Sequence, residues 1–334
     1  MSLAQITVCV PAFNQPGLLH DALDSLCDQG LRREDYVVAV SDDASPTPLR
    51  ETVSAFEERL QIVYQRTDRN IGHLANFERS TMLTATPYIS FLPHDDLVAP
   101  GQLGRALTAI KQHSGTVLVA SLVLTQRFPG APFTHLHGLF LRGAAKASYS
   151  RVYEWDAAEW MALGLVTTPL SIVGSLFHAE TFRRCDSWKR FPLWHDRLMM
   201  AEMGFHGGVI SLPWIGGYYR ESANQLSGQL WENHSAEFLE VSALLTARCQ
   251  AEGIPVKAFW VDQICQATPD ERILYLQMLK RAATDDVFQR IKQESEARLH
   301  TRLHLGGRLD RLAIPVPVAE FVRGVDRFIR SRRP

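Results

Sequence analysis

The stretch SFLPHDDLVAPG, residues 90–101, places two adjacent carboxylates directly after a short apolar run. That run, YISFL (88–92), is rich in aromatic and branched residues and too short for a typical helix, so it predicts a buried strand. Asp95 and Asp96 therefore stand at the carboxyl end of a strand. Two interpretations are open at this point. The pair binds a divalent cation and a polyhydroxyl ligand, or it turns the chain and caps the helix that begins near Pro100.

The same kind of apolar run recurs along the first 125 residues, alternating with segments of helical spacing. The runs are ITVCV (6–10), YVVAV (36–40), LQIVY (60–64), YISFL (88–92) and TVLVASLVL (116–124). The helical stripes between them contain Leu18, Leu19, Ala22, Leu23 and Leu26, then Leu74, Phe77 and Met82, then Leu103, Leu107 and Ile110. Strands that alternate with helices indicate βαβ crossovers, and hence an α/β fold with a Rossmann-like, mostly parallel central sheet flanked by helices.

Polar clusters follow three of these strands, at the sheet edge where ligands bind in such folds. They are PAFNQ (11–15), SDDAS (41–45) and PHDD (93–96). In the second cluster, Asp42 and Asp43 can accept hydrogen bonds from a base or a ribose hydroxyl. The alternative is an N-cap for the helix near Pro48. The first βα turn has no glycine-rich phosphate loop, which argues against dinucleotide-binding and P-loop proteins.

Three residues of the second half are further candidates. Asp196, in LWHDRLMMAEMG, starts a predicted helix; it is either a general base or a helix-start aspartate favoured by the helix dipole. Its neighbour His195 is a metal ligand, a polar contact or simply a solvent-exposed histidine. Arg220, in GGYYRESANQLSG, either clamps a diphosphate or pairs on the surface with Glu221.

The composition limits the classes of function. The chain has 334 residues, 46% of them hydrophobic and 21% charged, with a formal net charge of -1, as in ordinary soluble globular proteins. Because it is not basic overall, we expect no nucleic-acid partner. Five scattered cysteines without a CxxC pair indicate reduced thiols and a cytoplasmic location. There is no signal-peptide pattern and no apolar run long enough for a transmembrane helix.

Four of these patterns occur together in one order, which is more specific than any of them alone. ITVCVPAFNQPGLLHDALDSL, VVAVSDDAS, RNIGHLANFERS and YISFLPHDDLVAPGQL resemble the nucleotide-binding half of family 2 glycosyltransferases, and WHDRLMMAEMG and GGYYRESANQLS resemble the acceptor half. The resemblance covers residues 5–229. It implies a GT-A fold, with a catalytic domain over residues 1–229 that divides into a nucleotide-sugar half (1–125) and an acceptor half (126–229).

The resemblance also implies roles on the donor side. The donor is a nucleotide-diphosphate sugar, with a UDP-sugar favoured, and a divalent cation (Mn²⁺ or Mg²⁺) bridges its diphosphate. Asp96 ligates this cation, and Asp95 holds the ribose or the sugar. The remaining donor-side residues line the nucleotide: Pro11, Ala12 and Phe13 at the base, Asp43 on the base with Asp42 beside it, and Asn70 and Gly72 over the nucleotide.

On the acceptor side, the resemblance implies that Asp196 deprotonates the acceptor hydroxyl, that His195 contacts substrate, and that Arg220 meets the leaving diphosphate from a flexible loop. The chain also departs from the family pattern. Pro93 and His94 precede the aspartate pair where the family often has Asp-Xaa, so the first acid is missing; His195 replaces the usual glutamate, and Ser222 replaces a common histidine. The Gln-Xaa-Xaa-Arg-Trp signature of processive synthases is absent, which favours addition of a single sugar.

Beyond residue 229 the composition predicts a helical C-terminal region, residues 230–334, with helices over 231–251, 269–283 and 285–304. From Lys280 onward there are 13 lysines and arginines against 7 acidic residues. The last predicted helix, VAEFVRGVDRFIRSRR, is basic and amphipathic. It either lies on an anionic membrane surface as a peripheral anchor or packs its apolar stripe on the catalytic domain.

The sequence therefore predicts an inverting, metal-dependent glycosyltransferase that adds one sugar to a glycan or lipid-linked acceptor in cell-surface polysaccharide synthesis. A nucleotidyltransferase on a similar scaffold is one alternative, but it needs a basic, glycine-rich first loop, which PAFNQPG does not provide. A catalytically inactive relative that binds a nucleotide sugar or a partner is the other, suggested by the missing acid at Pro93.

Overall fold

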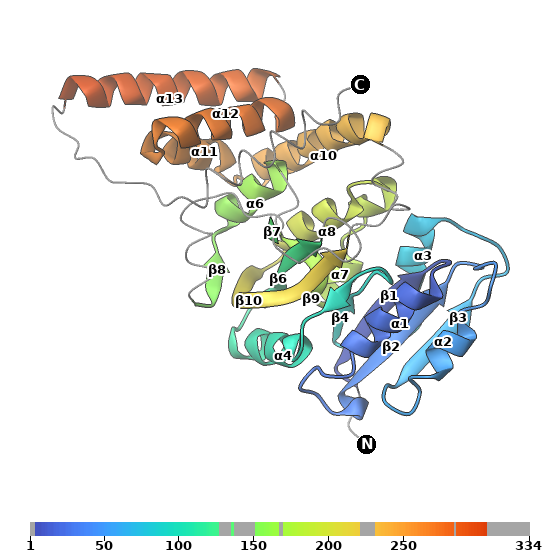
Figure 1. Cartoon of the computed structure of the whole chain (residues 1–334). Helices are drawn as coiled ribbons and strands as arrows, with labels where there is room; N and C mark the ends of the chain where they lie inside the picture. The colour runs from blue at the N-terminus through green and yellow to red at the C-terminus, as the bar shows by residue number, and fades with distance from the viewer. Residues whose placement is uncertain are drawn as a thin grey trace.

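The computed structural model describes residues 4–126, 135–136, 151–166, 170–220, 231–283 and 285–305. A single curved sheet runs through the α/β part of the molecule, and a group of C-terminal helices covers one end of it (Figure 1). The strand order is β3-β2-β1-β4-β9-β6-β10-β5, with β7 beside β6 and β8 beside β10.

The N-terminal half of the sheet is parallel. Its strands are β1 (Ile6–Ala12), β2 (Tyr36–Asp42), β3 (Ile62–Arg66) and β4 (Tyr88–Phe91), which pair in the order β3-β2-β1-β4. Every residue of β1 and β2 is buried, as expected for parallel strands covered on both faces. The connections are α1 (Pro16–Ser25), the short η1 (Arg33–Asp35), α2 (Arg50–Ser54) and α3 (His73–Ser80). The predicted strands of this half are confirmed, and so are the helical stripes except at Met82, which lies beyond the end of α3 and is exposed.

The second half of the sheet is mixed. Strand β9 (Ser171–His178) inserts antiparallel between β4 and β6 (Thr116–Gln126), while β6 runs parallel to β10 (Gly208–Arg220). Three short strands complete it: β5 (Leu97–Val98), β7 (His135–Leu136) and β8 (Tyr153–Trp155). Since β9 lies beside β4, strands that are 80 residues apart in sequence become neighbours, and the end of β4 faces elements of the second half.

Helices flank this half as well. They are α4 (Gln102–Gln112), α6 (Ala157–Val166), α7 (Ala179–Arg183), η2 (Ser187–Arg190) and α8 (His195–Met203). Helix α6 is buried along nearly its whole length, with Trp160, Met161 and Leu163 fully enclosed. It is apolar all round because it packs on α8 and on the C-terminal helices at the same time.

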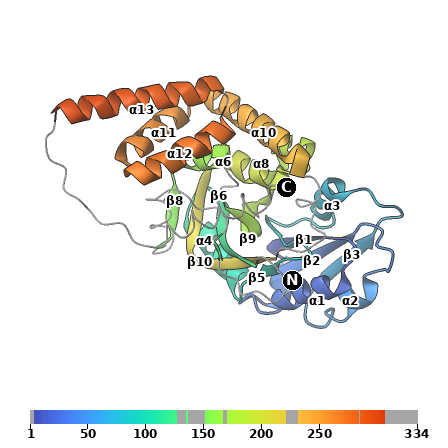
Figure 2. The same cartoon turned by 45° about the horizontal axis from the view of Figure 1, so that its top comes forward.

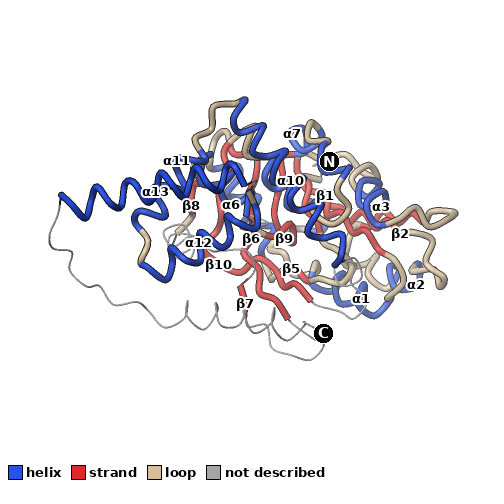
Figure 3. The backbone as a smooth tube through the Cα atoms, turned by 90° about the horizontal axis from the view of Figure 1, so that it is seen from above, coloured by secondary structure: helices blue, strands red, loops and turns tan. Residues whose placement is uncertain are grey.

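The C-terminal region is helical, as predicted, and consists of α10 (Trp231–Ala251), α11 (Val256–Gln266), α12 (Pro269–Ala282) and α13 (Asp285–Leu305) in the described residues. Figure 2 shows these helices beside α6 and α8, away from β1–β3, and in Figure 3, seen from above, α11, α12 and α13 lie on the side of the molecule opposite to α1 and α2. Helix α11 was not predicted. Helix α12 starts with a capping box between Thr268 and Glu271. None of the described helices is long and apolar enough to span a bilayer. The predicted basic helix near the C-terminus lies outside the described residues.

Candidate active site

A cavity of about 590 Å³ opens at the carboxyl ends of β1, β2 and β4. The start of α3 and the turn before α8 complete its wall. Nine of the predicted site residues line it: Pro11, Ala12, Phe13, Asp43, Asn70, Asp95, Asp96, His195 and Asp196. The structure therefore brings together candidates that are up to 185 positions apart in the chain, as the topology of an open α/β sheet requires.

Asp43 fixes the loop that leads into α3. One carboxylate oxygen accepts the backbone N–H of Ile71 at 2.7 Å, and the other accepts the N–H of Gly72 at 3.0 Å. The N–H of Gly72 also lies 3.0 Å from the side-chain oxygen of Asn70. Gly72 has a φ of 88°, a conformation that costs glycine little. Asp43 thus holds the loop above the cavity while its side chain lines it.

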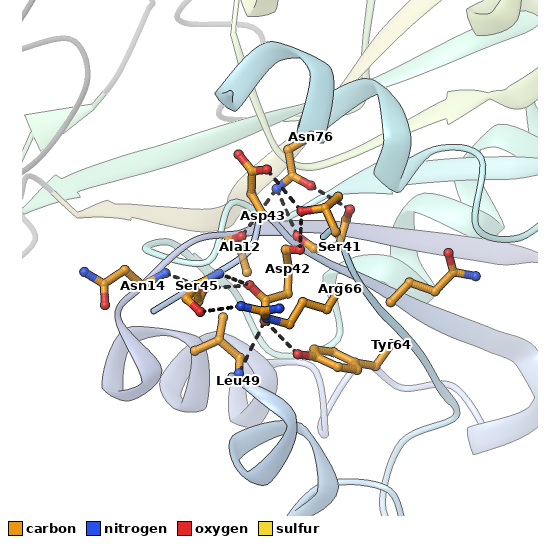
Figure 4. A network of polar contacts seen from close by, with 12 residues as sticks. Ala12, Asn14, Ser41, Asp42, Asp43, Ser45, Leu49, Tyr64, Arg66 and Asn76 are labelled. Carbon is orange, nitrogen blue, oxygen red and sulfur yellow. Dashed lines mark hydrogen bonds and ion pairs between the residues drawn. The ribbon is translucent and has the colours of Figure 1, made fainter. Parts of the chain in front are cut away.

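Asp42, by contrast, does not line the cavity, which corrects the prediction that it contacts the nucleotide (Figure 4). Its carboxylate is fully buried and accepts the backbone N–H and hydroxyl of Ser45, at 3.0 and 2.6 Å, and the hydroxyl of Tyr64 at 2.6 Å. Burial tends to raise the pKa of Asp42, but these hydrogen bonds outweigh it and leave the pKa lowered. Asp42 shapes the turn after β2.

The backbone at the ends of β1 and β2 is strained. Asn14, Gln15 and Ala44 have φ angles of 52°, 125° and 53°, which non-glycine residues rarely adopt. The N–H of Asn14 donates to the hydroxyl of Ser45 at 2.8 Å, so the two strained turns are bonded to each other. Asn14 and Gln15 line the cavity. Such strain is typical of functional sites, where the surrounding structure holds an unfavourable backbone in place.

Asp96 is buried and lines the cavity. A turn after β4 sets its position, since its N–H donates to the carbonyl of Pro93 at 3.0 Å. One of its carboxylate oxygens accepts the backbone N–H of Arg220 at 3.0 Å. Burial, and then the charge of Asp95, raise the pKa of Asp96 well above its ordinary value. A cation at this position would lower that pKa again, so the site favours positive charge.

Arg220 is the last residue of β10 and is buried, so it is neither the surface arginine nor the loop arginine of the sequence prediction. Its guanidinium donates to the backbone carbonyl of Asp95, to the carbonyl of Leu18 at 3.2 Å and to the carboxylate of Asp21 at 2.9 Å. It is absent from the residues that line the cavity. Arg220 thus joins the Asp95–Asp96 turn to α1.

The part of the cavity wall formed by α8 carries Asp196 in the first turn of this helix and His195 at its first position. His195 is buried, not solvent-exposed, and its Nδ1 donates to the carbonyl of Pro192 at 3.1 Å. The ring of His73 meets it edge-on, with the centroids 4.7 Å apart. Burial lowers the pKa of each of the two histidines to about 4. Both are therefore neutral at neutral pH and offer uncharged hydrogen-bonding groups.

Sequence reasoning missed several residues of the cavity, among them His73, Asn76, His94 and Tyr219. His94 follows Pro93, which stands at the position of the missing acid; one ring nitrogen of His94 lies 3.3 Å from the carbonyl of Pro11, to which it can donate. Burial lowers the pKa of His94. Because His73 and Asn76 lie on α3 three positions apart, they face the same side of that helix, a signal that could have identified them.

The charged side chains that line the cavity are all acidic: Asp43, Asp95, Asp96 and Asp196. Among the described residues, no lysine or arginine is part of the lining, and no group of three or more histidines, cysteines and acids is placed to hold a metal ion. A hard cation such as Mg²⁺ or Mn²⁺ commonly uses one or two carboxylates and takes its other ligands from a substrate diphosphate. The Asp95–Asp96 pair fits that mode of binding.

Glycosyltransferases are among the known proteins that this chain resembles. Residues 7–156 match the family model described as "Glycosyl transferase family 2". This segment, less than half of the chain, is thus similar to family 2 glycosyltransferases. It is 31% identical over 139 residues to validoxylamine A glucosyltransferase of Streptomyces hygroscopicus subsp. jinggangensis, an alignment that covers 40% of this chain and 32% of that protein. The chain thus spans about a third of the length of that curated relative.

Two solved structures share the fold of most of the chain. TarS 1–349 of S. aureus, solved with UDP-GlcNAc, has a TM-score of 0.52 at 12% identity and covers 93% of this chain and 95% of its own. The mannosyltransferase PcManGT of Pyrobaculum calidifontis, solved with GDP-Man and Mn²⁺, has a TM-score of 0.50 at 14% identity, over 90% of this chain and 88% of its own. The GT-A fold predicted from the sequence is confirmed, including its helical C-terminal part.

Proposed function

We propose that this chain is an inverting, metal-dependent glycosyltransferase that moves one sugar from a nucleotide-diphosphate sugar to a hydroxyl group. One observation carries the proposal: a single cavity is lined by Asp43, Asp95 and Asp96, which follow β2 and β4, and by Asp196 from the first turn of α8. The acceptor would be a glycan or a lipid-linked precursor of a cell-surface polysaccharide. The glucosyltransferase named above glucosylates validoxylamine A, according to its name, which agrees with the addition of a single sugar.

The donor would lie on the wall built by β1, β2 and β4. Its base would rest against Pro11, Ala12 and Phe13, where the ring of Phe13 is 41% exposed and available for stacking. Asp43 would accept a hydrogen bond from the base, and the loop of Asn70 and Gly72 would cover the nucleotide. We favour a UDP-sugar, since TarS is solved with UDP-GlcNAc.

The diphosphate needs positive charge, and the described lining supplies none from lysine or arginine. Asp96 would hold a divalent cation, with Asp95 beside it on the ribose or the sugar, and the bound cation would neutralise the leaving diphosphate. The solved complex of PcManGT contains Mn²⁺, which supports this choice. Arg220 would contribute to diphosphate binding indirectly. Its guanidinium holds the backbone carbonyl of Asp95, and its backbone N–H holds the carboxylate of Asp96.

Transfer itself would require a base on the other wall. A carboxylate oxygen of Asp196 would take the proton of the acceptor hydroxyl. The acceptor oxygen would then bond to the anomeric carbon on the face opposite the diphosphate, the bond from that carbon to the diphosphate oxygen would break, and the nucleoside diphosphate would leave with the electron pair. The neutral histidines His73 and His195 would contact sugar hydroxyls without adding charge.

We also propose that the protein works in the cytoplasm, a location that its five scattered cysteines, without a CxxC pair, support. The basic segment 318–333 would bring it to an anionic membrane surface, where lipid-linked acceptors reside.

The test is a thermal-shift panel of UDP-, GDP-, dTDP- and CMP-sugars, each with and without Mn²⁺, on the wild type and Asp96→Ala. A ligand at 100 times its Kd adds about 2.7 kcal/mol to the free energy of unfolding, a shift of several degrees. We expect one nucleotide class to stabilise the wild type only with Mn²⁺, and the variant not at all. Donor turnover should fall roughly a thousandfold in Asp96→Ala, since a charge pair at ~4 Å contributes about 4 kcal/mol.

Two other outcomes would change the proposal. Equal shifts for the wild type and Asp96→Ala would mean that the aspartate pair only turns the chain. Nucleotide binding without turnover of any donor or acceptor would favour the inactive relative, which the Pro93-His94 departure suggests.

A further inference from the structure

Helix α10 lies outside the segment that matches the family model, yet it reaches the acceptor wall of the cavity. One carboxylate oxygen of Glu237 accepts the backbone N–H of Leu193 at 2.7 Å and the N–H of Trp194 at 2.9 Å. These two residues form the turn immediately before α8, and Leu193 lines the cavity. A single side chain of the C-terminal region thus fixes two successive backbone groups of the site.

The same helix meets this turn through its neighbouring residue. The ring of Phe238 contacts the ring of Trp194, with centroids 4.8 Å apart at an interplanar angle of 66°. On its other side, the guanidinium of Arg197 lies 4.0 Å from the centroid of Phe238. Phe238 is therefore packed between the residues that flank His195 and Asp196 in sequence.

Arg197 is fully buried and joins three helices. Its guanidinium donates to the carbonyls of Gly164 and Leu165 on α6, at 2.6 Å each, and to the carbonyl of Phe238 on α10 at 3.0 Å. It also donates to the hydroxyl of Ser242 on α10 at 2.6 Å. Arg197 follows Asp196 directly, so the first turn of α8 is held on its buried side by α6 and α10.

These contacts converge on the residues that face the acceptor. The carbonyl of Pro192 accepts from the ring of His195, and Pro192, Leu193, His195 and Asp196 all line the cavity. Each of the two anchors is within three residues of Asp196 in the chain. A displacement of the turn by even 1 Å would change the position of its carboxylate, and misplacements of that size can cost about a hundredfold in rate.

We propose that Glu237 and Arg197 are positioning residues, through which the C-terminal helices hold Asp196 and the acceptor wall in the geometry required for transfer. The C-terminal helical region is then part of the catalytic unit and not an appended module. The inference rests on the proposed function, because Glu237 affects turnover only if Asp196 is the base of the transfer reaction. It predicts a loss of turnover without a loss of donor binding, since the donor wall is built from other elements.

Glu237 is the better residue for the test, because the loss of Arg197 would leave several buried carbonyl groups without donors and could prevent folding. In the full-length chain, Glu237→Ala removes both hydrogen bonds, whereas Glu237→Gln keeps an oxygen that can accept them. Glu240→Ala is the matched control: Glu240 lies on the same helix and is exposed. The readouts are hydrolysis of UDP-glucose and UDP-GlcNAc with Mn²⁺, and the Kd of UDP with Mn²⁺ by calorimetry.

We expect Glu237→Ala to lower kcat about ten- to a hundredfold while the Kd of UDP with Mn²⁺ stays within about twofold of the wild-type value. Glu237→Gln should recover most of the turnover, and Glu240→Ala should behave like the wild type. Amide hydrogen exchange of residues 191–198 should accelerate in Glu237→Ala, with no change at β1 and β2.

The inference is wrong if Glu237→Ala turns over as fast as the wild type, or if it loses UDP affinity and turnover by the same factor, which would indicate a general loss of structure. A different result would count against the proposed function itself: a wild-type chain that neither binds UDP with Mn²⁺ nor hydrolyses any donor of the panel. The two failures are distinguishable, since the first requires an active wild type.

Discussion

The two walls of the cavity are held in place in different ways. The donor wall is fixed within the N-terminal half: Asp43 bonds to the next loop along the chain, and the turns after β1 and β2 bond to each other through Ser45. The acceptor wall depends on partners that come later in the chain, on α10. The family match ends at residue 156, before this wall begins. The segment that would bind the donor therefore lies within the family match, whereas the turn before α8 and its supports on α10 lie beyond it.

The largest expected effect is on turnover, in a variant that changes the acceptor wall and leaves the donor wall unchanged. Asp196→Asn keeps the size of the side chain but removes the base, so transfer or hydrolysis should fall about 10²- to 10⁴-fold. The Kd of UDP with Mn²⁺ should not change, because the nucleotide lies on the other wall. Rate measurements and calorimetry on the same preparation test both statements. A variant with wild-type turnover would remove Asp196 from the chemistry and leave the acceptor wall without an assigned base.

Asp42→Asn tests whether the carboxylate next to Asp43 is structural. Its oxygens accept from Ser45, Leu49 and Tyr64 in a buried site, and an amide can accept fewer of these bonds and has no charge. We expect a loss of about 3 kcal/mol in the free energy of unfolding, measured by urea denaturation, with the Kd of UDP nearly unchanged in the folded variant. A stable variant that has lost nucleotide affinity would show that Asp42 takes part in nucleotide binding.

These contrasts also explain what the sequence could predict. The strands of the parallel half are short apolar runs bounded by polar clusters, so both their positions and the polar edge of the sheet follow from local pattern. Asp42 and Asp43 are adjacent and chemically identical, and only the turn geometry decides which of them faces the cavity. The spacing of His73 and Asn76 is a local signal, but Glu237 reaches the acceptor wall through tertiary packing between elements far apart in sequence, a relation that no local pattern contains.

The neutral histidine pair makes the free energy of unfolding depend on pH. The folded pKa values of His73 and His195 are about 4, below the ordinary value of about 6.5 in the unfolded chain. Between these values the unfolded state binds more protons, so the free energy of unfolding falls as the pH drops from 7 to 5, by about 2 kcal/mol for each histidine. Above pH 7 the pair contributes no slope.

Urea denaturation at pH 7.5 and pH 5 measures this dependence, and His195→Gln is the comparison. The raised pKa of Asp96 acts in the opposite sense, but it is present in both proteins and cancels in the difference. We expect the variant to lose less stability on acidification than the wild type does. Equal losses would show that the histidines are already protonated or exposed in solution.

The smallest expected effect concerns the connection between the donor wall and α1. Asp21 is 56% exposed and pairs with Arg220 at 2.9 Å, so Asp21→Asn should cost less than about 1 kcal/mol of stability. The bonds from the guanidinium of Arg220 to the carbonyl of Asp95 and from its backbone N–H to the carboxylate of Asp96 remain in this variant, and the affinity for UDP with Mn²⁺ should change by no more than a few-fold. Arg220→Met removes the guanidinium contact to the carbonyl of Asp95 as well and should weaken metal-dependent UDP binding further. If Arg220→Met instead left metal-dependent binding intact and reduced only turnover, Arg220 would act on the diphosphate during transfer, and the strand end of β10 would belong functionally to the acceptor wall.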